Sequence, residues 1–147
     1  MNQTLAFEIP AKALATSNRK AIGRNGKMFD AHKGKAAYVA TIRLFASRAV
    51  TEQGWKITER PVWLSLEFGF VRPKGHFGTG RNAGVLKESA PRWPTTRNGD
   101  RTNCLKSTED ALTGIVWSDD SQVVDGPVRK VYADSEFIRV VVRELEN

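Results

Sequence analysis

Acidic side chains and a lysine are concentrated between residues 99 and 125. The sequence there is GDRTNCLKSTEDALTGIVWSDDSQVVD, and it contains Asp100, Lys106 and the adjacent pair Asp119 and Asp120. Hard cations such as Mg²⁺ prefer oxygen ligands, and carboxylates from two separate segments can converge on one ion while leaving positions for water and phosphate. A nearby ammonium group stabilises the negative charge that develops when a phosphodiester is attacked. Asp100, Asp120 and Lys106 therefore suit a metal-dependent phosphodiester-cutting site.

The same residues also suit structural roles. Asp100 directly precedes a predicted helix, where aspartate caps the first turn. Lys106 lies four residues before Asp110, the spacing of a helical ion pair, and an Asp119–Asp120 pair is typical of a turn. These residue types and spacings alone leave both interpretations open.

Two helices and several strands must position these side chains. Apolar spacing and turn residues predict, in order, a strand at 4–9, a helix at 36–50, a strand at 62–70, a long loop at 72–101, a helix from Thr102 to Thr113 ended by Gly114, a strand bent at Asp125-Gly126-Pro127, and a final strand in EFIRVVVREL. This order, β-α-β-loop-α-β-β, predicts an α+β fold. We expect one domain over residues 1–147, with a mixed sheet packed by two helices.

Composition narrows the class of protein. The 147 residues allow one modest core, and 23 Lys and Arg against 16 Asp and Glu give a net charge of +7, which favours a polyanionic partner. Cys104 is the single cysteine, so neither an internal disulfide nor a cysteine-based zinc cluster can form within one chain, as fits a cytoplasmic protein. No apolar run is long enough to predict a membrane span.

Basic side chains gather in two segments, 15–35 and 72–101. The first contains Asn25-Gly26, a strong turn signal, and predicts a basic loop or hairpin. The second is either a functional loop or a solvated loop with scattered charges. The candidate phosphate-binding residues are Arg19, Arg24, Lys27, Arg72, Lys74, Arg81, Arg97 and Lys130. His76, Phe77 and Trp93 either stack on bases or anchor the second loop.

The order of the acidic residues resembles the core pattern of the RusA family of Holliday junction resolvases, especially its phage and prophage branch. That pattern is Asp-x-Asp-Asn-Leu-x-Lys, then Asp-Ala-Leu, and after a short linker an aspartate pair followed by x-Gln-Val-Val. The matching segments here are 100–106, 110–112 and 119–124. The basic stretch 72–93 and the basic turn leading into a helix over 27–50 are similar as well.

This resemblance implies a homodimeric, Mg²⁺-dependent endonuclease that binds four-way DNA junctions and nicks two opposing strands symmetrically in recombination and repair. It implies that Asp100 and Asp120 bind metal, that Lys106 is catalytic and that Asp119 supports them, with metal binding by Asp119 if a turn intervenes. It also implies a bacterial cytoplasmic protein encoded by a phage or prophage.

Two positions depart from the family pattern, and one of them, Cys104 in place of a leucine, is most simply a small buried apolar residue. Thr102 stands where the family has its second metal-binding aspartate, and a neutral hydroxyl is a weak replacement. Glu109 follows seven residues later on nearly the same helical stripe, roughly 10 Å along the axis, and is either a substitute ligand or a surface glutamate. Two hypotheses remain: an active junction endonuclease, or a DNA-structure-binding protein of the same fold with weakened chemistry.

Overall fold

The computed structural model describes residues 2–15, 20–26, 28–30, 34–95 and 99–147. Over these residues the chain forms an α+β fold with one mixed sheet, two α-helices and a separate hairpin. The elements are β1 (Thr4–Ile9), β2 (Lys20–Ile22), β3 (Met28–Asp30), α1 (Lys35–Gln53), β4 (Val62–Val71), the 3₁₀ turns η1 (Lys74–His76) and η2 (Gly80–Asn82), α2 (Arg101–Leu112), the 3₁₀ turn η3 (Asp120–Gln122), β5 (Val123–Asp125), β6 (Val128–Ala133) and β7 (Phe137–Glu144).

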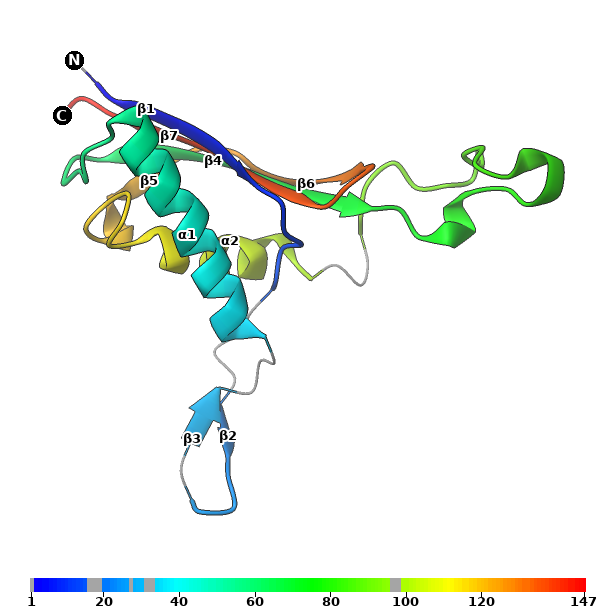
Figure 1. Ribbon diagram of the computed structural model, residues 1–147, viewed down its shortest axis with the longest axis horizontal. Coiled ribbons are helices and arrows are strands. Elements are labelled where there is room, and N and C mark those ends of the chain that lie inside the picture. The colour runs from blue at the N-terminus through cyan, green and yellow to red at the C-terminus, as the bar shows by residue number, and fades with distance from the viewer. Residues whose placement is uncertain (1, 16–19, 27, 31–33, 96–98) are drawn as a thin grey trace.

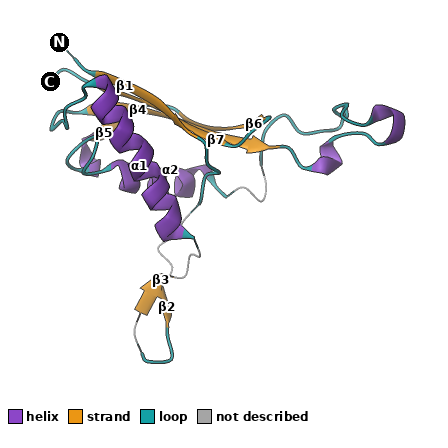
Figure 2. Ribbon diagram, viewed as in Figure 1, coloured by secondary structure: helices purple, strands orange, loops and turns teal. Residues whose placement is uncertain are grey.

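Strand β4 lies at the centre of the sheet. It pairs antiparallel with β7 on one side and parallel with β5 and β6 on the other, while β1 pairs with β7 at the edge. Strands β6 and β7 follow each other in sequence, yet β4 lies between them. Both helices cover the same face of this sheet (Figures 1 and 2). The predicted α+β fold, a mixed sheet packed by two helices, is confirmed.

Alternating side chains of β4 build the core. Leu64, Leu66 and Phe68 are buried on the helix side, where Ile42 and Ala46 of α1 join the same core. This confirms the predicted strand and helix, although α1 extends beyond residue 50 to Gln53. Neither helix is long and apolar enough to cross a membrane in the part of the chain that the structure describes.

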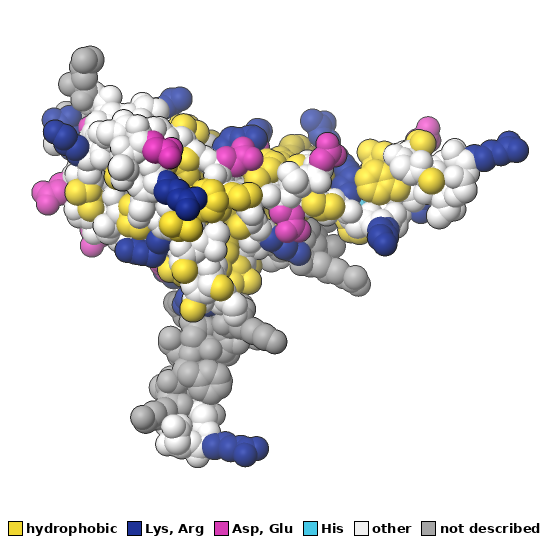
Figure 3. Space-filling model, in the orientation of Figure 1, with side chains coloured by type: hydrophobic (Ala, Val, Ile, Leu, Met, Phe, Trp, Pro, Cys, Tyr) yellow, Lys and Arg dark blue, Asp and Glu magenta, His cyan; other side chains and the backbone are white. Residues whose placement is uncertain are grey.

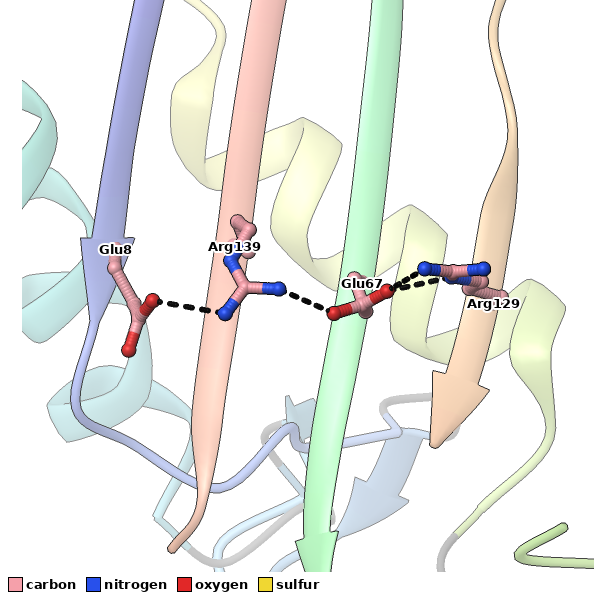
Figure 4. A network of polar contacts seen from close by, with 4 residues as sticks. All are labelled: Glu8, Glu67, Arg129 and Arg139. Carbon is pink, nitrogen blue, oxygen red and sulfur yellow. Dashed lines mark hydrogen bonds and ion pairs between the residues drawn. The ribbon is translucent and has the colours of Figure 1, made fainter. Parts of the chain in front are cut away.

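The face of the sheet away from the helices carries a chain of ion pairs (Figure 4). Arg139 of β7 lies between Glu8 of β1 and Glu67 of β4, and Arg129 of β6 reaches Glu67 from the other side. Because β-strands place alternate side chains on opposite faces, these charges lie across the sheet from α2. They link neighbouring strands and neutralise one another there.

Between β5 and β6, the backbone of Gly126 lies very close to the backbone of Leu64 in β4. Gly126 has φ 127°, and a Cβ atom at this position would lie 1.8 Å from the carbonyl oxygen of Leu64. The next residue, Pro127, accepts a hydrogen bond from the backbone N–H of Leu66 at 3.0 Å. The predicted bend at Asp125-Gly126-Pro127 is therefore confirmed, and glycine is required by contact as well as by φ.

The segment 72–95 is a folded arm rather than a plain loop. Figure 1 shows it projecting past the end of the sheet. Its two limbs are joined by backbone hydrogen bonds, from Lys87 N–H to His76 O and from Gly78 N–H to Val85 O, each 2.9 Å long. At its base, Arg72 donates to Pro91 O at 2.7 Å. The described part of the arm therefore has its own internal support.

We expect Gly126→Ala to destabilise the fold by about 3 kcal/mol, because it adds a backbone clash to the strain of a positive φ. The matched control is Gly84→Ala, where φ is also positive, at 77°, and no atom lies within 4 Å of the added Cβ. This control should cost about 1 kcal/mol. Urea unfolding of both variants measures the difference, and equal losses would contradict the close approach at Leu64.

Candidate functional site

Helix α2 is fixed to the body by contacts along its buried side. Tyr38 Oη of α1 lies 3.0 Å from Thr108 Oγ1, and Ser107 Oγ donates to the carbonyl oxygen of Leu14 at 2.6 Å. At the far end, Arg43 Nη1 donates to the carbonyl oxygens of Ala111 and Thr113 at 3.1 and 3.2 Å. A cation at this end also complements the helix dipole. The opposite, polar face of α2 is thereby held toward solvent.

Asp100 caps the start of α2. Its Oδ1 accepts from the backbone N–H of Asn103 at 2.7 Å, and its Oδ2 accepts from Asn103 Nδ2 at 3.0 Å. The capping role that the sequence allowed is confirmed, and the side chain of Asn103 adds an anchor that sequence reasoning did not assign. Because Asp100 is exposed, its carboxylate is oriented by the protein and still open to solvent.

Asp119 and Asp120 lie where a turn begins. The side chain of Asp119 accepts from Ser121 N–H at 2.9 Å. Hydrogen bonding to the side chain of Ser121, followed by this backbone bond, lowers the pKa of Asp119. Gln122 Oε1 accepts from the backbone N–H of Asp119 at 2.7 Å, while its Nε2 donates to the carbonyl oxygens of Thr58 and Arg60, each at 2.9 Å. Gln122 therefore anchors the turn to the segment before β4.

That turn alters the expectation for the aspartate pair. An extended segment would point the two side chains in opposite directions, whereas a turn intervenes here, and a turn is the condition that the resemblance sets for metal binding by Asp119. The Asp119 carboxylate is nonetheless occupied in capping the turn. Asp120 carries no such cap in the described contacts and is exposed. The sequence contained a signal for Gln122, because the family pattern has a glutamine two residues after the aspartate pair.

Glu109 of α2 lies close enough to Asp120 for the two carboxylate charges to interact. Burial, followed by the negative charges of Asp120 and Asp110, raises the pKa of Glu109 from 4.5 to about 7, against the lowering effect of Lys106. Carboxylates from two separate segments thus interact at the C-terminal half of α2. Asp100 lies nine residues before Glu109, roughly 13 Å along the helix.

The carboxylates do not form a complete metal cluster. Within the described ranges, no three Asp, Glu, His or Cys side chains gather closely enough to hold an ion together. The two acids from separate segments that interact are Glu109 and Asp120, whereas Asp100 is hydrogen-bonded to Asn103. Coordination of one ion by Asp100 and Asp120 together stays a prediction.

Lys106 lies on the exposed face of α2, close to this acidic group. Its Nζ is 3.7 Å from Asp110 Oδ2, and the two side chains are 47% and 54% exposed. The i,i+4 pair that the sequence allowed is confirmed. A pair this exposed contributes little to stability, so a phosphate can compete for the ammonium group at small cost.

The candidate phosphate-binding residues fall into three groups. Arg24, Lys74 and Arg81 are exposed on the hairpin and the arm, and Figure 3 shows basic side chains at the ends of both projections. Arg72 and Lys130 have structural contacts: the guanidinium of Arg72 lies 4.3 Å from the centroid of the Tyr132 ring, and Lys130 Nζ donates to Gly99 O at 2.8 Å. The residues outside the described ranges are Arg19, Lys27 and Arg97.

Comparison with known proteins identifies the class to which this fold and site belong. The family model of endodeoxyribonuclease RusA matches residues 10–143, nearly the whole chain. A relative from Bacillus subtilis (strain 168), the "Uncharacterized protein YqaN", is 30% identical over 145 residues, which cover 96% of each protein. The chain therefore belongs to the RusA family of endodeoxyribonucleases, and the resemblance drawn from the acidic motif is confirmed.

The raised pKa of Glu109 predicts a pH dependence of stability. Because the folded-state pKa lies above the usual 4.5, the folded protein binds the extra proton between pH 4.5 and 7, and the free energy of unfolding falls as pH rises through this range. Glu109→Gln should remove this fall and stabilise the protein at pH 8 by about 1 kcal/mol, a value reduced for solvent screening at a half-buried site.

Thermal unfolding at pH 5 and pH 8 tests this expectation. Glu146→Gln, at an exposed position near the C-terminus, is the matched control and should follow the wild type at both pH values. An unchanged pH dependence in Glu109→Gln would show that the pKa of Glu109 is not raised by burial and by the neighbouring acids as described.

Proposed function

We propose that this protein is a Mg²⁺-dependent endonuclease that binds four-way DNA junctions and resolves them by paired symmetric nicks, acting as a homodimer in recombination and repair. Membership of an endodeoxyribonuclease family supports the cutting of DNA. The observation that carries the proposal is the approach of Glu109 to Asp120 beside Lys106 on the exposed face of α2. The bacterial relative fits the proposed setting, the cytoplasm of a bacterium with phage or prophage DNA.

The chemistry of the donor set fits a magnesium ion. Mg²⁺ is commonly held by one or two carboxylates and completes its octahedron with waters and substrate phosphate. Glu109 and Asp120 would supply two such carboxylates, and their mutual repulsion, which contributes to the raised pKa of Glu109, is the energy that a cation would relieve. Asp100 and Asp119 are further acidic groups of the same motif, each oriented by a backbone N–H bond.

Glu109 would compensate for the family aspartate that Thr102 replaces. Both residues are on α2, and a half-buried carboxylate at 109 can reach an ion from the helix face that Asp120 approaches. When bound, Mg²⁺ supplies a Lewis acid for the phosphate and lowers the pKa of a water. The protein's own part is to hold the acids at fixed positions through the bonds that anchor α2 and η3.

Lys106 would stabilise the charge on the phosphate under attack. In the resting protein its ammonium group lies 3.7 Å from Asp110 Oδ2 and close enough to Glu109 to oppose the rise in the pKa of that carboxyl. A phosphate dianion-like transition state is the stronger partner, because a charge-assisted bond to it forms as negative charge builds up. Asp110 is thus a positioning residue, and Lys106 is the proposed catalytic cation.

The two projections would grip the arms of the junction. Arg24 on the hairpin and Lys74 and Arg81 on the arm present cations to DNA phosphates, and Arg19, Lys27 and Arg97 are proposed for the same task. Such contacts position DNA without reading its sequence and weaken as salt rises. A two-fold dimer would offer identical sites to the two symmetry-related strands, as paired nicking requires.

A second candidate function is junction binding with weakened chemistry. It is favoured by one observation, the neutral and exposed Thr102 at a position where the family has a carboxylate.

Thr102→Asp separates the two candidates, with Thr102→Asn as a control that has the same shape as aspartate but no charge. If the site is already complete through Glu109, both variants should cleave a junction within about twofold of the wild type; if not, Thr102→Asp alone should gain activity of about tenfold or more.

The primary experiment incubates the protein with a four-way junction or a linear duplex, in Mg²⁺ or in EDTA, and resolves both labelled strands. We expect paired nicks only with the junction and Mg²⁺. Asp120→Asn should lower the cleavage rate by about 10²-fold or more, with junction binding in EDTA unchanged. The matched control, Asp134→Asn in the exposed turn after β6, should cut normally.

Failure of the wild type to cut, with junction binding intact, would favour the second candidate. Loss of both binding and cutting in Asp120→Asn would assign Asp120 a structural role and contradict the proposed metal site.

A further inference from the structure

An open hollow of about 850 Å³ lies beside the start of α2. Trp93 and Pro94 line it from the base of the arm, Asp100 and Arg101 from the start of α2, and Val128 and Lys130 from β6. Its volume is within the range of ligand pockets in proteins. The hollow therefore joins the arm, the sheet and the acidic motif at one place.

Two hydrogen bonds hold its walls together. Arg101 Nη1 donates to Val128 O at 3.2 Å, and Lys130 Nζ donates to Gly99 O at 2.8 Å. Both bonds run between the start of α2 and β6, so the two walls are fixed to each other. They also place two cationic groups at the hollow, each with further N–H donors beyond the one in the bond.

Trp93 offers a large aromatic surface at the rim. It is 47% exposed, whereas the next residue, Pro94, is buried and anchors the backbone. The guanidinium of Arg92 lies 5.1 Å from the Trp93 ring centroid. Exposed indole rings beside cations are suited to bind nucleotides, because every base has a π-face on which the ring can stack and every nucleotide carries a phosphate that the cation attracts.

The composition of the hollow favours a nucleotide over an all-apolar or all-ionic ligand. Trp93, Pro94 and Val128 suit a flat apolar ring, while Arg101 and Lys130 suit its phosphate. A base that is stacked and paired in a duplex cannot leave it without cost, and this cost is lowest for a base that is already unpaired. Unpaired or loosened bases are expected where the arms of a junction meet.

We propose that this hollow binds a nucleobase that is unpaired at the branch point of the DNA, with Trp93 as its stacking platform. The proposal rests on the proposed function and deepens it, since it names the part of the substrate that is recognised next to Asp100. It assigns the base of the arm a role distinct from phosphate contact: detection of the branch itself.

The test uses two fluorescent probes in EDTA, so that no strand is cut. One is a four-way junction with 2-aminopurine at the branch point, and the other is a linear duplex with a single unpaired 2-aminopurine, compared with its fully paired counterpart. Wild-type protein should change the fluorescence of both unpaired probes and should bind the bulged duplex more tightly than the paired one.

Trp93→Ala should weaken binding to both unpaired probes about tenfold and abolish the fluorescence change, as expected for the loss of one base–aromatic stack. Trp93→Phe should restore most of the affinity. Val85→Ala is the matched control, because Val85 is an exposed apolar residue of the same arm, 56% exposed, and does not line the hollow. Affinity for the paired duplex should stay the same in all variants.

Equal binding of the unpaired probes by wild type and Trp93→Ala would overturn the proposal, even if the wild type cuts junctions normally. Equal loss in Trp93→Ala and Val85→Ala would overturn it too, because the effect would then belong to the arm in general. A wild type without preference for junctions would refute the proposed function, while the bulged duplex would still decide whether the hollow takes a base.

Discussion

The repulsion between two carboxylates on different segments is the interaction on which the proposed metal site depends. Burial and the nearby negative charge of Asp120 both disfavour the charged form of Glu109, which is half-buried, whereas Asp120 is exposed. Proteins do not gain stability from such a pair. A divalent cation that binds there would replace this repulsion with coordination by both carboxylates. The neighbouring ammonium group of Lys106 would then favour the binding of a phosphate.

The fold maintains this unfavourable pair through bonds that lie elsewhere. Arg43 and Tyr38 hold α2 against α1, and Gln122 holds the turn of Asp120 against the segment before β4. Each of these is a polar side chain bonded to a backbone carbonyl or a buried hydroxyl, so the acidic groups are positioned by the scaffold rather than by each other. The bend at Gly126 then carries β6 beside β4 and sets the wall of the hollow next to Asp100.

Local patterns in the sequence predicted most of the elements but not their contacts. Alternation in β4 and helical spacing in α1 and α2 follow directly from burial of one face, and the cap by Asp100 and the pair of Lys106 with Asp110 follow from fixed local spacing. The pairing of β4 between β6 and β7 and the approach of Glu109 to Asp120 depend on which distant segments meet. A motif gives no distance between such segments, so it favoured Asp100 as the partner of Asp120, and it gave no sign of the hollow beneath Trp93.

The position of a bound metal ion tests the proposed site most directly. Crystals of the protein grown with Mn²⁺ in place of Mg²⁺ allow the ion to be located by its anomalous scattering. We predict a peak within coordination distance of carboxylate oxygens of both Glu109 and Asp120 and none in Glu109→Gln. A peak held by Asp100 without Glu109, or the same peak in Glu109→Gln, would contradict the claim that this pair forms the metal site.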